Sequence, residues 1–295
     1  MDMTTIEDLP LHRTTSVGGL TMHAIEAGLQ MLDGGAMFGV VPKPLWEKRI
    51  AADDRNRIPL AMRCLLIEAP NALVLVDTGV GNKESEKFMS IYGIRNAGSP
   101  TRLEDGIRAA GHAPEDVDIV LSTHLHFDHA GGNTVRRDDG RIEPAFPNAT
   151  YVVQRGEFEF AHSRNERIRA SYLGPNFDPL PDDRWRFLDG AQVVTEGVRV
   201  EPTPGHTPHH QSVWVEDGGA VALFLADVCP TTAHLPLPWI MGYDLEPLVT
   251  LESKRGLWER ATKEGWRLIF EHDAHVPWGH LDPDASRPTL VESDE

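Results

Sequence analysis

Short apolar runs rich in β-branched residues alternate with turn signals along most of the chain. Residues 62–69 and 72–79 are two such runs, and the Pro70-Asn71 pair between them predicts a β-hairpin. Further strands are predicted where similar runs recur, at residues 117–123, 149–154, 211–217, 220–227 and 266–272.

Two segments between these runs have the period of a helix. Thr101 and Glu104 form a capping-box pattern at the start of a helix that Gly111 can end. A second helix is predicted from Pro247 to Gly265. Its apolar residues would share one side: Leu248, Leu251, Trp258 and Ala261. Strands with helices between them indicate a layered α/β fold.

The chain of 295 residues has no repeat and no linker that would divide it, so a single domain is expected over residues 1–295. Residues 1–16 are expected to form an N-terminal arm, and the acidic residues 283–295 a loose tail. The segment Phe38–Ile58 fits neither period. It could be a surface loop, a contact between two copies in a homodimer, or a wall of a pocket.

The net charge limits the possible binding partners, and the cysteine content bears on the cellular location. The net charge of −17 argues against nucleic acid or an anionic membrane surface as a partner. Two cysteines are too few for a disulfide scaffold, which favours a cytoplasmic location. The N-terminal residues do not have the pattern of a signal peptide, and no apolar run is long enough to span a membrane. A small molecule is the expected partner.

Potential metal ligands are concentrated at the ends of predicted strands. The stretch LSTHLHFDHAGGN, residues 121–133, places three histidines and one aspartate within six positions. Four more such residues each follow an apolar run: Asp77, His206, Asp227 and His272. Loops at the carboxyl ends of strands converge in open α/β layers, so the joint occurrence predicts one site.

The spacing suits two divalent cations. His124 and His126 are two positions apart, so on an extended segment they can share one ion. Asp128 and His129 follow where the chain turns, and they can face a second ion. A carboxylate such as Asp227 can bridge two cations. Imidazole and carboxylate favour zinc, while iron, manganese and cobalt remain open.

The motif His124-Leu-His126-Phe-Asp128-His129, followed in order by His206, Asp227 and His272, resembles the metallo-β-lactamase superfamily. The resemblance extends from about Gly19 to His280 and implies an αββα sandwich. It also implies the ligand sets: His124, His126 and His206 for one metal, Asp128, His129 and His272 for the other, and Asp227 between them. Asp77 matches a non-ligand carboxylate that orients the metal-binding loops.

The reaction that this resemblance implies is hydrolysis of an ester-like bond. The two metals would produce the hydroxide that attacks. Asp227 would bridge the metals, and Asp128 would relay a proton to the leaving oxygen. Local sequence segments such as LDGGAMFGVVPKPLWEKR resemble those of the quorum-quenching branch of the superfamily, whose enzymes open N-acyl-homoserine lactones. Organophosphate or aryl-ester hydrolysis and a glyoxalase II-like thioesterase activity are the alternatives. A non-catalytic binding protein would be expected to lack a ligand, and none is missing.

One position departs from the lactonase pattern. Those lactonases carry a tyrosine three positions after the bridging aspartate, and Pro230 stands there in this chain. Thr231, Thr232, His234 or Tyr243 could supply the missing group, and His234 is the favoured candidate. Six apolar residues in irregular segments could line an acyl-chain pocket or pack beneath loops: Met37, Phe38, Leu237, Trp239, Ile240 and Met241.

Overall fold

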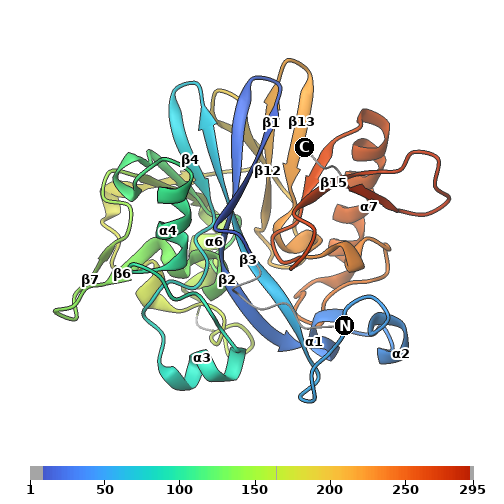
Figure 1. Ribbon diagram of the computed structural model, residues 1–295, viewed down its shortest axis with the longest axis horizontal. Coiled ribbons are helices and arrows are strands. Elements are labelled where there is room, and N and C mark those ends of the chain that lie inside the picture. Colours follow the sequence, from blue (N-terminus) through green and yellow to red (C-terminus); the bar gives the residue numbers. More distant parts are fainter. Residues whose placement is uncertain (1–8, 164, 293–295) are drawn as a thin grey trace.

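The computed structural model describes residues 9–163 and 165–292. Two seven-stranded sheets face each other, and helices cover the outer face of each (Figure 1). In Figure 1, α4 (Arg102–Ala109) covers the sheet built from the earlier part of the chain, and α7 (Pro247–Glu264) covers the other. The predicted αββα sandwich is confirmed.

The chain builds the two sheets in succession. The first has the order β1 (His12–Val17), β2 (Leu20–Asp33), β3 (Arg57–Ala69), β4 (Ala72–Val76), β5 (Ile119–Leu121), β8 (Thr150–Gln154), β9 (Trp185–Leu188). The second has the order β10 (Gln192–Thr195), β11 (Val198–Pro202), β12 (Gln211–Asp217), β13 (Ala220–Phe224), β14 (Arg267–Ile269), β15 (Trp278–Leu281), β16 (Leu290–Glu292). A separate hairpin pairs β6 (Thr134–Arg136) with β7 (Ile142–Pro144).

Alternation along the strands gives the first sheet two apolar faces. Met22 and Ala24 of β2 pack into the core between the sheets, while Ile25 packs outward against α4. Successive side chains point to opposite faces of a strand, so both faces must be apolar when both are covered. This explains why the longest strands read as nearly continuous apolar runs.

The two long helices begin and end where the sequence predicts. The Thr101 hydroxyl accepts a hydrogen bond from the Glu104 N–H and caps α4. Gly265, with φ of 68°, ends α7 in the left-handed conformation that favours glycine. The predicted apolar face of α7 is wrong at Leu248, which is 79% exposed. Trp258 and Ala261 pack on the second sheet as predicted, and Leu257 joins them.

Short helices fill the connections between strands. They are α1 (Gly34–Phe38), α2 (Lys43–Trp46), α3 (Glu86–Tyr92), α5 (Phe127–Ala130) and α6 (Arg155–Ala161). The segment that fitted neither period contains the end of α1 and all of α2. Phe38 and Trp46 stack there with ring centroids 5.2 Å apart, and both are buried. The segment is therefore an ordered, packed part of the domain.

Both expected tails contribute strands. Residues 12–16 of the expected arm belong to β1, which pairs with β2, so the arm is shorter than predicted. The expected loose tail ends in β16, whose Leu290 pairs with Leu281 of β15. Residues 1–8 and 293–295 of these two segments lie outside the described residues. Within the described ranges, the helices are too short or too polar to cross a membrane.

A buried ion pair joins β3 to β2, and its arginine also holds the segment that follows β14. The Arg63 guanidinium lies 2.7 Å from Glu26 Oε1, and both side chains are almost fully buried. Arg63 also donates hydrogen bonds to the carbonyl oxygens of Phe270 and Asp273. It thereby fixes the backbone on either side of residues 271 and 272 against the first sheet.

We expect Arg63→Met to lower the free energy of unfolding by about 3–5 kcal/mol, because the variant leaves the Glu26 carboxylate buried without a counter-charge. Arg141→Met is the matched control, since Arg141 pairs with Asp139 on the exposed surface and should change stability by less than about 1 kcal/mol. Urea unfolding followed by circular dichroism measures both. Equal stabilities of the two variants would contradict the role of the buried pair.

Candidate metal centre

The structure brings all seven predicted ligands to one edge of the sandwich. His124 and His126 follow β5, and α5 presents Asp128 and His129 directly afterwards. The others follow β11, β13 and β14: His206, Asp227 and His272. The connections after these strands converge because the strands end at the same edge of the paired sheets.

Three imidazoles and one carboxylate form the first group. His126 Nδ1 lies 3.1 Å from His124 Nε2 and 3.0 Å from His206 Nε2. Asp227 Oδ2 lies 3.0 Å from the same His206 nitrogen and 3.9 Å from His124 Nε2. Ligands about 2.0–2.2 Å from one tetrahedral cation are roughly 3.3–3.6 Å apart. The group therefore has the size of a single-ion site.

The second group lies on the other side of Asp227. His129 Nε2 and His272 Nε2 are 3.2 Å apart, and each lies 3.9 Å from a carboxylate oxygen of Asp128. Asp227 Oδ1 lies 3.1 Å from His272 Nε2. Asp227 thus turns one oxygen toward each group, which is the arrangement that a bridging carboxylate requires.

Hydrogen bonds fix which nitrogen faces the centre in the imidazoles of His129, His206 and His272. Asp77 accepts from the Thr123 N–H and hydroxyl and lies 3.1 Å from His129 Nδ1. It thus connects the end of β4 to two points of the histidine motif, as the resemblance implies for this position. Partners of this kind orient metal-binding imidazoles and keep one tautomer.

The remaining imidazoles are held in the same way. Asp244 Oδ1 lies 2.9 Å from His206 Nδ1, and the Ala61 carbonyl accepts from His272 Nδ1 at 2.7 Å. The Gln30 amide donates to Asp128 Oδ2 at 2.6 Å. Sequence reasoning missed Asp244 and Gln30, because one lies in an irregular segment and the other in the middle of a long apolar strand.

Glu157 of α6 connects two of the ligand-bearing loops. Its buried carboxylate accepts from the Leu125 N–H at 3.1 Å and from the Thr207 hydroxyl at 2.7 Å. The Tyr172 hydroxyl donates to it as well, at 2.7 Å. Leu125 lies between two ligands and Thr207 follows a third, so one carboxylate sets the relative position of both loops. Burial raises the pKa of Glu157. The sequence alone carries no signal for this contact.

Burial and neighbouring charges shift the pKa values of the ligands in opposite directions. Burial, with the nearby imidazoles, lowers the pKa of both His124 and His126 well below the usual range. Burial would also lower the pKa of His206, but the carboxylates of Asp227 and Asp244 outweigh it and raise that pKa to about 10. The carboxylates that raise the pKa of His206 would equally attract a divalent cation, which takes the place of the imidazole proton when it binds.

A hollow of about 370 Å³ opens onto the two ligand groups. Five of the predicted ligands line it: His126, Asp128, His206, Asp227 and His272. Two tyrosines, Tyr92 and Tyr243, also reach it. The rest of its wall is mainly apolar and includes Leu32, Met37, Phe127, Ile168, Met241 and Leu245. The ligands thus lie at the base of a concave site with an apolar wall.

The structure does not bring His234 into this hollow. Its ring is fully buried and stacks on Phe38, with ring centroids 4.4 Å apart. Both ring nitrogens are engaged, Nε2 with the Met37 carbonyl at 2.9 Å and Nδ1 with the Thr231 hydroxyl at 2.7 Å. Burial lowers the pKa of His234 to about 3, so the ring is neutral. This placement supports a packing role and does not support the catalytic role expected for it.

The six residues considered for an acyl-chain pocket are divided between several places. Met37 and Met241 line the hollow, as expected. Phe38 instead packs between Trp46 and His234. The other three lie elsewhere: Leu237 packs near α7, Trp239 lines a neighbouring hollow, and Ile240 lines neither.

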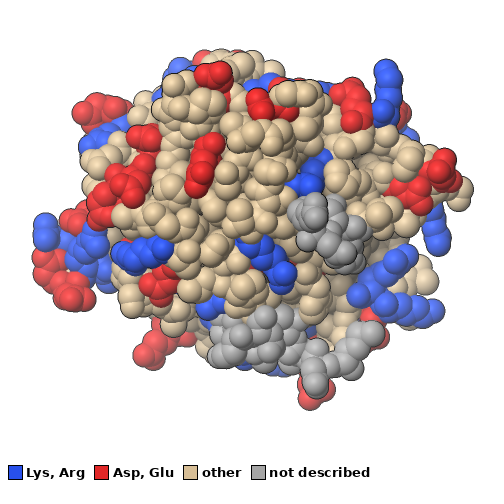
Figure 2. Space-filling model, turned by 45° about the horizontal axis from the view of Figure 1, so that its top comes forward, with Lys and Arg blue, Asp and Glu red and all other residues tan. Residues whose placement is uncertain are grey.

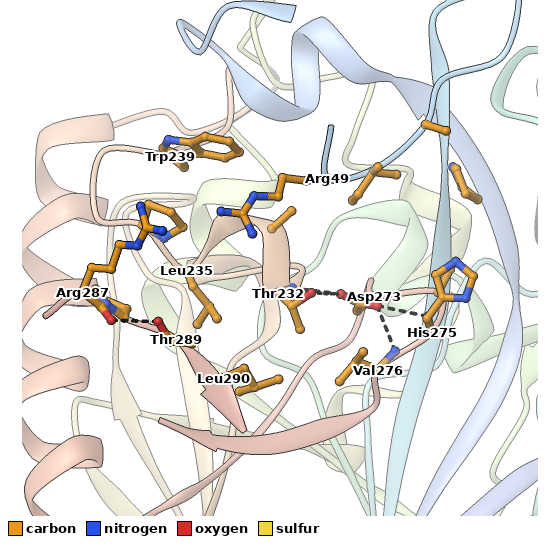
Figure 3. Close-up of a pocket in the computed structure, with 17 residues that line it drawn as sticks. Arg49, Thr232, Leu235, Trp239, Asp273, His275, Val276, Arg287, Thr289 and Leu290 are labelled. Carbon is orange, nitrogen blue, oxygen red and sulfur yellow. Dashed lines mark hydrogen bonds between the residues drawn. The ribbon is translucent and has the colours of Figure 1, made fainter. Parts of the chain in front are cut away.

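A second hollow, of about 650 Å³, is lined in part by residues of the segment 232–239 (Figure 3). Figure 3 shows Asp273 in its wall, where it accepts hydrogen bonds from Thr232 and from the backbone N–H groups of His275 and Val276. Arg49 and Arg287 line it as well. It contains none of the seven predicted ligands, so the chemistry belongs to the smaller hollow. Asp273 nevertheless orders the loop that follows His272.

The buried polar atoms fit divalent cations at this centre. Asp227 Oδ1 is buried 3.1 Å from Nε2 of His272, a ring whose Nδ1 donates to the Ala61 carbonyl. Bound to a cation through Nε2, that ring would have no proton for Asp227, and the same cation would satisfy the buried carboxylate oxygen. The donor set and the spacing of its atoms both agree with this fit.

Comparison with known proteins agrees with the geometry of the site. Residues 59–269 match the model of the metallo-beta-lactamase superfamily. An N-acyl homoserine lactonase of Bacillus cereus is 31% identical over 228 residues, which cover 74% of this chain and 83% of that protein. An N-acyl homoserine lactonase of Agrobacterium fabrum is 37% identical over 188 residues, covering 61% of this chain and 64% of that protein. The structure of a "probable metal-dependent hydrolase" from Staphylococcus aureus superposes with a TM-score of 0.87 at 29% identity, covering 95% of this chain and 99% of that one.

The chain belongs to the metallo-beta-lactamase superfamily. Within that superfamily it is a metal-dependent hydrolase that acts on ester bonds.

We expect Asp244→Asn to weaken metal binding at the first group about 10- to 100-fold, because the amide cannot hold His206 as the carboxylate does. Metal retained during competition with a chelator, measured by plasma mass spectrometry, provides the test. Asp178→Asn is the control, since Asp178 holds the exposed His162 and not a predicted ligand. Unchanged retention in Asp244→Asn would contradict the orienting role.

Proposed function

We propose that this hydrolase opens the lactone ring of N-acyl-homoserine lactones. The observation that carries the proposal is the hollow in which the ligand groups meet an apolar wall formed by residues such as Met37, Ile168 and Met241. A lactone ring at the metal groups would leave its acyl chain along that wall. The lactonases of Bacillus cereus and Agrobacterium fabrum support the same substrate class.

Two zinc ions are the proposed cofactors. His124, His126 and His206 would hold one, and Asp128, His129 and His272 the other, with Asp227 bridging them. When bound, such cations polarise the scissile carbonyl and lower the pKa of a water molecule, so that it is nucleophilic near neutral pH.

Asp128 is the proposed group for proton transfer. It lines the hollow, and its Oδ2 is fixed by the Gln30 amide at 2.6 Å. The carboxylate can take a proton during attack on the carbonyl and deliver it to the alkoxide that leaves when the ring opens. Gln30 keeps the carboxylate directed into the hollow while it does so.

Tyr243 is the proposed replacement for the lactonase tyrosine whose position Pro230 occupies in this chain. It lines the hollow together with Asp128 and Asp227, whereas His234 does not reach it. Burial and the nearby carboxylates of Asp33 and Asp128 raise the pKa of Tyr243 to about 12. The hydroxyl therefore keeps its proton at neutral pH and can donate a hydrogen bond to the lactone carbonyl or the leaving oxygen.

The surface and the thiols support the other proposed properties. Acidic and basic side chains are interspersed on the face in Figure 2, without a continuous basic area suited to nucleic acid. Cys64 and Cys229 are both free and buried, which supports a single domain in a reducing cytoplasm.

The first test is proton release on adding acyl-homoserine lactones of short and long chain to the metal-loaded protein. Paraoxon and S-lactoylglutathione serve as parallel substrates for the organophosphate and thioesterase alternatives. We expect rapid acid release from the lactones alone. Turnover of the phosphotriester or the thioester without lactone opening would refute the proposed substrate and retain the metal centre.

Tyr243→Phe should lower kcat for lactone opening roughly 100-fold while leaving KM and metal content near the wild-type values, because the hydroxyl acts on charge that develops in the transition state. Tyr92→Phe is the matched control, since it removes the other tyrosine hydroxyl of the same hollow. Steady-state kinetics on one lactone compares the three proteins. A larger loss of kcat in Tyr92→Phe would transfer the role to Tyr92.

A further inference from the structure

A second cluster of metal-binding side chains lies on the outer face of the first sheet. His23 Nε2 is 3.2 Å from Glu68 Oε1, and His112 Nε2 is 2.9 Å from the same oxygen. The three ligand atoms lie within 4.8 Å of one another. None of these residues belongs to the histidine motif or to the strand ends that build the hydrolytic centre.

The fold brings the three residues together from three separate elements. His23 is on β2, and Glu68 is near the end of the paired strand β3. Both side chains share the outer face with Ile25, on which α4 packs. Gly106 allows that packing, because a Cβ there would lie 2.4 Å from Ile25 Cγ2. The end of α4 therefore lies close to the strands, and His112 reaches over them.

A backbone hydrogen bond positions His112, and a neighbouring hydroxyl orients the imidazole of His23. The His112 N–H donates to the Ile107 carbonyl at 3.1 Å and closes the last turn after α4. Thr14, opposite His23 on β1, places its hydroxyl 2.9 Å from His23 Nδ1. With Nδ1 donating to that hydroxyl, a cation at this site would take the place of the proton that Nε2 shares with Glu68.

We propose that His23, Glu68 and His112 form a separate binding site for a divalent transition-metal cation such as zinc. The separations of 2.9 and 3.2 Å approach the roughly 3.3 Å expected between ligands of a tetrahedral zinc ion. Water completes the coordination on the exposed side, because the Glu68 side chain is 40% exposed. His23 and His112 hydrogen-bond to Glu68 and lower its pKa, so its carboxylate is ionised at neutral pH.

The site is distant from the hydrolytic centre and has a different consequence. Seven positions of β2 separate His23 from Gln30, which contacts Asp128, and this corresponds to roughly 20 Å along a strand. The cation would link β2, β3 and the end of α4 without touching substrate. It would stabilise the folded chain, because the unfolded chain does not hold the three ligands together.

The site is tested by measuring the metal content of the untagged, metal-loaded protein. The protein is first equilibrated with a small excess of zinc and then passed through gel filtration. We expect Glu68→Gln and His112→Gln each to retain one equivalent fewer than the wild type. His162→Gln is the matched control, because His162 contacts the Asp178 carboxylate and the Phe158 carbonyl rather than a second imidazole. It should retain the wild-type content. Equal content in all four proteins, or the same loss in His162→Gln, would overturn the proposal.

Two further measurements separate loss of metal from loss of fold. Excess zinc should raise the Tm of the wild type and of His162→Gln, and should leave the Tm of Glu68→Gln unchanged. If either variant does not fold, long-range ¹H–¹⁵N spectra of wild-type imidazoles decide the question. Resonances of His23 and His112 should shift as zinc is added beyond the content of the hydrolytic centre. Unshifted resonances would refute the site.

Discussion

The Asp77 carboxylate is the contact on which the geometry of the hydrolytic centre depends. It stands at the end of β4 with φ of 55°, a backbone conformation that residues other than glycine rarely adopt. From there it accepts two hydrogen bonds from Thr123 and lies beside His129. One strand end therefore holds the histidine motif at both sides of its turn. The same backbone conformation recurs at Ala226, directly before Asp227. Both sheets thus turn sharply where they approach the metal centre.

Other buried polar contacts extend this constraint across the sandwich. Glu157 fixes the loops around Leu125 and Thr207, and Arg63 fixes the backbone beside His272. Each is a charged group whose burial is offset by several hydrogen bonds or an ion pair. The ligands come from distant parts of the chain, so their convergence relies on these few contacts between loops. The centre is consequently preorganised by the protein around it.

The sequence predicted the layers and the ligands better than their surroundings. The ligands follow strand ends, a pattern that can be recognised in the sequence without knowing how the chain packs. All seven converge in the structure. His234 failed as a catalytic candidate because burial under Phe38 depends on how α1 folds back, which periodicity does not encode. Leu248 failed because an apolar residue in the first turn of α7 has no neighbouring layer to cover it. Asp244 and Gln30 were missed because a single hydrogen bond to a ligand leaves no spacing pattern.

The buried Lys254 of α7 anchors the irregular segment that leads into one wall of the smaller hollow. Its ammonium donates to the carbonyl oxygens of His234, Pro236 and Trp239, three points of that segment. Pro236 and Trp239 line the larger hollow, and the chain continues directly into Met241 and Tyr243 of the smaller one. A main chain anchored at three points cannot move aside without breaking buried hydrogen bonds. Any widening of the smaller hollow therefore falls to the rotamers of side chains from other segments, such as Ile168 and Leu32, rather than to this part of the main chain.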